Sequence, residues 1–66
     1  MITDLCNTII RRPNAVDFKA LVEEIKRRGS SDLNTEEIRM VIKVINTPEA
    51  QEEYTDFIEV LTSMII

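Results

Sequence analysis

Few side chains in this sequence could carry out chemistry. There is no histidine, a single cysteine (Cys6) and a single glycine (Gly29). The commonest general base and metal ligand is therefore absent, and one cysteine alone makes a poor nucleophilic or zinc site. One glycine cannot build a phosphate-binding loop. We expect a protein that is not an enzyme and that holds no metal or other cofactor.

Composition and charge favour a small binding protein. The chain has 66 residues, 44% hydrophobic and 30% charged, which suits one thin-cored globular domain over residues 1–66. The net charge of −4 argues against nucleic acid and anionic membranes and favours a basic partner. No secretory pattern and no apolar run of roughly 18 residues is present. We therefore expect a cytoplasmic protein without a membrane span.

Hydrophobic periodicity predicts an all-α fold of four helices. Apolar residues at i, i+3, i+4 and i+7 predict a helix over about residues 2–10 and a second over residues 15–28. A third should end at residue 45, and a fourth should run from near Thr55 to the C-terminus. Residues 48–53 also allow an earlier start of the fourth helix, with a proline at its first position.

Capping residues mark several of these helix ends. Asn14 can cap the second helix, and Asn34 or Thr35 can cap the third. Gly29 provides a left-handed stop after the second helix. The basic residues 26–28 suit the negative end of that helix, so we interpret them as helix-end charges rather than as a binding site.

Two short segments of the chain read alike, residues 16–21 and residues 55–60. Each places an Asp-Phe pair at the start of an apolar helix. A repeat in so small a chain suggests two copies of one supersecondary unit. We therefore expect Phe18 and Phe57 to be paired core anchors at the heads of two helices. Cys6 should be a small apolar core residue.

In the order of its elements, the chain resembles the EF-hand family, in which a helix, a loop and a second helix form one unit. The resemblance implies a paired EF-hand-like lobe, with unit one over about residues 1–29 and unit two over about residues 34–66. In that family the residue before the Asp-Phe pair, here Val16 and Thr55, contributes to a short β-bridge between the loops. The whole chain is similar to a single calmodulin-like lobe.

The calcium loops depart from the family pattern. An EF-hand loop has about 12 residues, oxygen ligands and a bidentate glutamate at its end. The first loop here is shortened and contains Arg11 and Arg12, and Ala20 replaces the glutamate. The second loop keeps Glu59 at the matching position, but Pro48 occupies its front and no glycine allows the sharp turn. We expect no metal site.

The resemblance implies a calcium-independent module that holds a basic amphipathic, IQ-type helix. Small single-lobe light chains of unconventional myosins are the members that it is most similar to. Lobes of this kind bind their target helix in an apolar groove, and acidic residues suit a basic target. We expect the groove to be formed by Leu21, Ile25, Val41, Val60, Leu61 and Met64, with the carboxylates of Glu23, Glu24, Glu52 and Glu53 around its rim.

Three other interpretations stay open. The chain could be a weakly calcium-responsive sensor that uses the loop between Pro48 and Glu59, where Glu52, Glu53 and Asp56 supply carboxylates. It could be a self-associating helical structural protein whose apolar C-terminus pairs with a second copy. It could also be an unrelated four-helix bundle, because such bundles reuse aspartate near helix N-termini and phenylalanine in cores.

Overall fold

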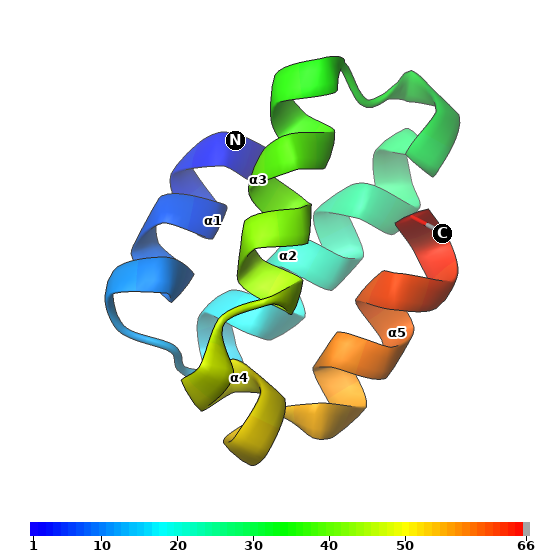
Figure 1. The fold of residues 1–66 in the computed structure, drawn as a ribbon. Coiled ribbons are helices and arrows are strands. Elements are labelled where there is room, and N and C mark those ends of the chain that lie inside the picture. Colours follow the sequence, from blue (N-terminus) through cyan, green and yellow to red (C-terminus); the bar gives the residue numbers. More distant parts are fainter. Residues whose placement is uncertain (66) are drawn as a thin grey trace.

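A computed structural model describes residues 1–65 of the chain, and all of its regular structure is helical (Figure 1). Its elements, in chain order, are α1 (Ile2–Arg11), α2 (Ala15–Arg28), the short 3-10 turn η1 (Ser30–Asp32), α3 (Thr35–Ile45), α4 (Pro48–Glu53) and α5 (Thr55–Ile65). No strand occurs within residues 1–65. The predicted all-α class is confirmed.

The predicted number of four helices is wrong, because the last segment forms two. Pro48 opens α4 at a position where its missing N–H costs nothing. The helix ends at Tyr54, whose backbone leaves the helical region (φ −125°, ψ 42°). A new helix, α5, starts at Thr55. The predicted helix start near Thr55 is confirmed, whereas residues 48–53, expected at most to extend that helix, form a separate one.

The predicted caps of the other helices are confirmed. The side chain of Asn14 accepts a hydrogen bond from the backbone N–H of Asp17 at 2.9 Å. Asn34 and Glu37 form a reciprocal capping box at the start of α3. Gly29 follows α2 with φ +84°, a conformation that side chains with a Cβ rarely adopt. These local interactions fix where α2 ends and where α3 begins.

The core lies where α1 packs against α2 and α3, and where α5 packs against α2 and α3. Cys6 is fully buried there, as predicted. Four residues that were predicted to line a binding groove, Leu21, Ile25, Val41 and Leu61, are also buried there. The buried apolar residues are Ile2, Cys6, Ile9, Phe18, Leu21, Val22, Ile25, Leu33, Val41, Val44, Ala50 and Leu61.

Phe18 is the residue through which the C-terminal part joins α2. It is fully buried, and its ring stacks on Tyr54 (centroids 5.1 Å apart) and on Phe57 (5.4 Å). The hydroxyl of Tyr54 also donates a hydrogen bond to the carbonyl of Pro13 at 3.4 Å. The predicted pairing of Phe18 with Phe57 is confirmed, and Tyr54 extends it to three rings.

The repeated Asp-Phe segments both lie at helix starts, but not in the way that the EF-hand resemblance implied. Val16 lies in the first turn of α2 and Thr55 in the first turn of α5, so neither contributes to a β-bridge. The β-bridge prediction is therefore wrong for both residues, because each is already part of a helix. The paired EF-hand arrangement itself stays a hypothesis.

The stack at Phe18 generates a prediction about stability. Phe18→Ala should remove a fully buried ring at a cost of about 3–5 kcal/mol, which is comparable to all that a core of this size supplies, roughly 3–5 kcal/mol. The variant should be largely unfolded at room temperature by circular dichroism. Phe57→Ala should lose clearly less stability in urea titrations, because Phe57 is only half-buried. Equal urea midpoints for Phe18→Ala and wild type would contradict the role of the stack.

Candidate partner-binding surface

The negative charge of the chain is concentrated in its last third. Residues 44–66 contain five carboxylates and no lysine or arginine, whereas residues 1–43 contain eight basic and seven acidic residues. All five carboxylates are exposed, on α4 and on the first half of α5. The net charge of −4 is therefore a local property of these two helices. The acidic residues are Glu49, Glu52, Glu53, Asp56 and Glu59.

The same region also carries partly accessible apolar side chains. Helix α5 has six apolar residues, of which only Leu61 is fully buried. Val60 is 37% exposed, and Met64 is half-buried. In Figure 1, α5 lies at one edge of the molecule and α1 at the other. The outward face of α5 is therefore available to another molecule.

One row of side chains on α5 combines charge with apolar character. Asp56, Val60 and Met64 follow one another at i, i+4 and i+8, so they lie on one face of the helix, one turn apart. We call these three residues the α5 ridge. The ridge is acidic at its N-terminal end, close to α4, and apolar towards the C-terminus. Such a gradient suits a ligand that is basic at one end and apolar at the other.

Most of the apolar residues predicted to form a groove do not lie on this surface. Leu21, Val41 and Leu61 are fully buried, and Ile25 is 1% exposed. They are correctly identified as apolar faces, but a 66-residue domain uses those faces to build its own core. The expectation that they line an open groove is therefore corrected. Of the predicted set, only Val60 and Met64 reach the surface.

The predicted acidic rim is divided between two places. Glu52 and Glu53 are exposed on α4 and belong to the acidic surface. Glu23 and Glu24 lie on α2 instead, next to the basic residues 26–28. The guanidinium of Arg27 donates hydrogen bonds to the carboxylate of Glu24 and lowers the pKa of that carboxyl. The carboxylate of Glu24 stays ionised, and Arg27 compensates its negative charge within α2.

Sequence reasoning missed three members of the acidic surface. Glu49, Asp56 and Glu59 lie with Glu52 and Glu53 on α4 and α5. The signal that could have found them is the absence of any lysine or arginine after Lys43. A net charge for the whole chain hides this asymmetry, whereas a count for each segment reveals it.

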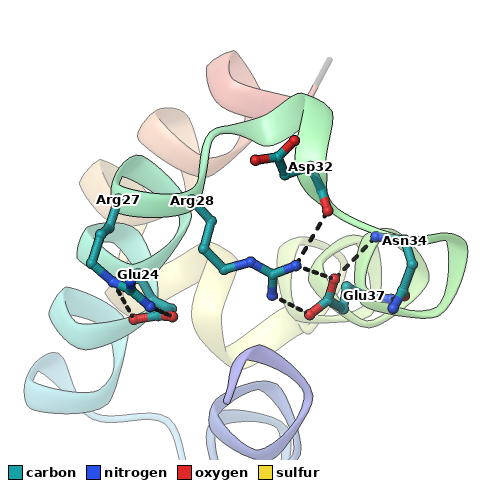
Figure 2. Close-up of polar contacts among 6 residues, drawn as sticks. All are labelled: Glu24, Arg27, Arg28, Asp32, Asn34 and Glu37. Atoms are coloured by element: carbon teal, nitrogen blue, oxygen red, sulfur yellow. Dashed lines mark hydrogen bonds and ion pairs between the residues drawn. The ribbon is translucent and has the colours of Figure 1, made fainter.

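A second polar cluster joins α2 to α3 (Figure 2). The carboxylate of Glu37 is only 5% exposed and accepts hydrogen bonds from both terminal nitrogens of Arg28. It also accepts one from the backbone N–H of Asn34 at 3.0 Å, and Arg28 donates to the carbonyl of Asp32 at 3.2 Å. Together these contacts connect the last turn of α2, the η1 turn and the first turn of α3.

The hydrogen bonds of this cluster shift the pKa values of Glu37 and Arg28. Hydrogen bonds from Arg28, and then from the Asn34 backbone, lower the pKa of the Glu37 carboxyl. The same interaction raises the pKa of Arg28. The interpretation of residues 26–28 as helix-end charges holds for Arg28, which is engaged within the fold. Its pairing with Glu37 was missed because nine positions separate the two residues.

The single thiol does not offer a reactive site. Cys6 is fully buried in α1, and this burial raises the pKa of its thiol to about 12. The thiolate, which is the nucleophilic form, is therefore scarce at neutral pH. Cys6 acts as a small core residue.

The connections between helices do not fit the calcium ion that an EF-hand resemblance would imply. Between α1 and α2 the chain has only residues 12–14, which include an arginine and a proline. Residues 46–47 connect α3 to α4, and α4 then occupies the middle of the expected second loop. Among residues 1–65, no three acidic, histidine or cysteine side chains come together as a metal site.

No family model, curated protein or solved structure matches this chain. Within residues 1–65, no helix has the length and apolar character to cross a membrane.

The Glu37 cluster generates a prediction about acid stability. Because the folded-state pKa of Glu37 lies below its ordinary value of 4.5, its contribution to stability is present above that value and is lost as the pH falls through the folded-state pKa. Urea titrations from pH 7 down to pH 3 should show a smaller acid-induced loss of unfolding free energy in Glu37→Gln than in wild type. Glu36→Gln changes an exposed neighbour and should behave like wild type. A Glu37→Gln variant with the acid profile of wild type would contradict this role.

Proposed function

We propose that this chain is a calcium-independent binding module for a basic amphipathic helix, which it holds on α4 and α5. The observation that carries the proposal is the coincidence of two features on the same helices. All five carboxylates of residues 44–66 are exposed there without a compensating cation. The helix that carries two of them, α5, also exposes Val60 and leaves Met64 partly accessible.

The charge distribution supports a cationic partner. Five like charges on two short helices repel one another, and this repulsion is relieved when a basic ligand binds. Such a surface also attracts basic ligands from a distance and increases their association rate at low ionic strength. By the same argument it disfavours a second copy of the whole α4–α5 surface as the occupant, because five carboxylates would then face five others.

The geometry of α5 supports a helical partner. Val60 and Met64 are one turn apart, so a second helix packed along α5 could place apolar residues at i and i+4 against them. Asp56 and Glu59 lie towards the acidic end of the same helix. The partner should therefore have apolar anchors at one end of its contact and lysine or arginine residues at the other.

The partner class that the EF-hand resemblance implies is an IQ-type helix, for example in an unconventional myosin. Such helices combine basic and apolar positions, which agrees with the charge and apolar surface of α4 and α5. The choice of an IQ-type helix rests on the EF-hand resemblance, whereas the choice of a basic amphipathic helix rests on the surface of α4 and α5. A basic helix of another origin would satisfy the same surface.

Calorimetry of the full chain against basic amphipathic peptides tests the proposal. In EDTA and at low salt, IQ-type peptides should bind more tightly than about 100 μM, and added salt should weaken binding. Met64→Asp and Val60→Asp should abolish binding with helicity retained, because both residues reach the surface. Glu52→Lys should weaken it severalfold, mainly through the association rate.

Matched variants keep this test specific. Val16→Asp places the same charge on another exposed valine, on α2, and Asp4→Lys makes the charge reversal of Glu52→Lys on α1. Both should bind like wild type. Absence of binding to every basic peptide, or equal loss in the control variants, would contradict the proposal. Sedimentation of the free chain as a dimer that Val60→Asp dissociates would favour the self-associating alternative.

A further inference from the structure

The end of α2 presents three consecutive cations followed by two exposed hydroxyls. Residues 26–28 are Lys-Arg-Arg, Gly29 ends the helix, and Ser30 and Ser31 open the η1 turn. We propose that Ser30 is a phosphorylation site for an ATP-dependent protein kinase with an acidic substrate groove. This site is separate from the acidic surface on α4 and α5.

The serine side chain is accessible and the segment around it is weakly held. Ser30 is exposed, and its hydroxyl makes no hydrogen bond within the described part of the chain. The turn is closed by two backbone hydrogen bonds, from Asp32 to the carbonyl of Gly29 (3.0 Å) and from Leu33 to that of Ser30 (3.3 Å). Apart from its chain neighbours, no heavy atom lies within 4 Å of the place where a Cβ on Gly29 would be. Local opening of this segment, which a kinase groove requires, disrupts these two backbone hydrogen bonds and the bond from Arg28 to the carbonyl of Asp32 at 3.2 Å.

The preceding arginines supply the recognition. Arg27 lies three residues before Ser30, with 71% of its side chain exposed. Its contact with Glu24 lies at the surface, where an ion pair contributes little, so carboxylates of a kinase can replace it. Arg28 lies two residues before Ser30 but is paired with Glu37, so a kinase carboxylate contacts it only when that ion pair opens. Ser31 is one position farther from both arginines and directly precedes Asp32, whose charge disfavours an acidic groove.

The reaction is a simple phosphoryl transfer. The Oγ of Ser30 attacks the γ-phosphorus of ATP, and a new P–O bond forms as the bond to the oxygen bridging the β- and γ-phosphorus breaks. ADP leaves with that oxygen, and the hydroxyl proton passes to a base on the kinase. The product carries a charge of about −1.5 to −2 at neutral pH.

The new phosphate would lie where it competes for Arg28. In the unmodified chain Arg28 donates to both carboxylate oxygens of Glu37 (Figure 2). A phosphate two residues away is a stronger acceptor for a guanidinium than a single carboxylate. Glu37 would then stay buried with only the Asn34 N–H as its donor. Phosphorylation should therefore loosen the connection between α2 and α3.

Incubation of the full-length chain with MgATP and the catalytic subunit of cyclic-AMP-dependent protein kinase, a basophilic kinase, tests the site. Mass spectrometry should find one phosphoryl group on Ser30, and Ser30→Ala should abolish it while Ser31→Ala should not. Arg27→Gln should lower the initial rate by about tenfold, because a charge-assisted contact to the kinase is lost. Lys19→Gln removes an exposed cation elsewhere on α2 and should leave the rate unchanged.

Three results would overturn the assignment of the site: no incorporation into the folded chain, incorporation at Ser31, or an unchanged rate in Arg27→Gln. A separate measurement tests whether the phosphate on Ser30 competes with Glu37 for Arg28. NMR titration of the phosphorylated chain should show the Glu37 carboxyl titrating at a higher pH than in the unmodified chain. If Glu37 titrates at the same pH in the phosphorylated and the unmodified chain, the phosphate does not compete with Glu37 for Arg28.

Discussion

The stacking of Phe18 between Tyr54 and Phe57 is the contact on which the arrangement of the C-terminal part depends. One partner ring, Tyr54, belongs to the residue between α4 and α5, and the other, Phe57, lies in the first turn of α5. Phe18 lies near the start of α2. Its ring therefore holds the junction between α4 and α5 against that end of α2. The hydrogen bond from Tyr54 to Pro13 fixes the same break to the start of α2.

The small size of the domain explains which apolar side chains remain available for binding a partner. With one thin core, the chain buries the centre of every long helix face, including Leu21, Val41 and Leu61. Helix α5 packs against α2 and α3, with Leu61 fully buried and Phe57 stacked on Phe18, and its apolar residues other than Leu61 stay at least partly accessible. Its charges have no cation on the same helix. The surface proposed for a partner is therefore what remains after the core is complete, and it acts through exposed side chains rather than through an open cleft.

Much of this fold follows from local sequence signals. Apolar periodicity predicted α1, α2 and α3, and the caps at Asn14, Gly29 and Asn34 marked their ends, because these features act within one turn of helix. The helix start near Thr55 was also predicted. The contacts of Tyr54 with Phe18 and Pro13, and the ion pair between Arg28 and Glu37, join distant residues, which periodicity does not encode. For the same reason the sequence identified the apolar faces but not which of them would be buried. The acidic surface could have been found by counting charges segment by segment.

The central claim is that α4 and α5 hold a basic amphipathic helix, and chemical-shift mapping tests it most directly. A ¹⁵N-labelled sample of the chain would be titrated with an unlabelled IQ-type peptide in EDTA. The account predicts that the amide shifts concentrate on residues 49–65, with the largest at Asp56, Val60 and Met64. Shifts concentrated on α1 or around Gly29 instead, or no shifts at millimolar peptide, would contradict it.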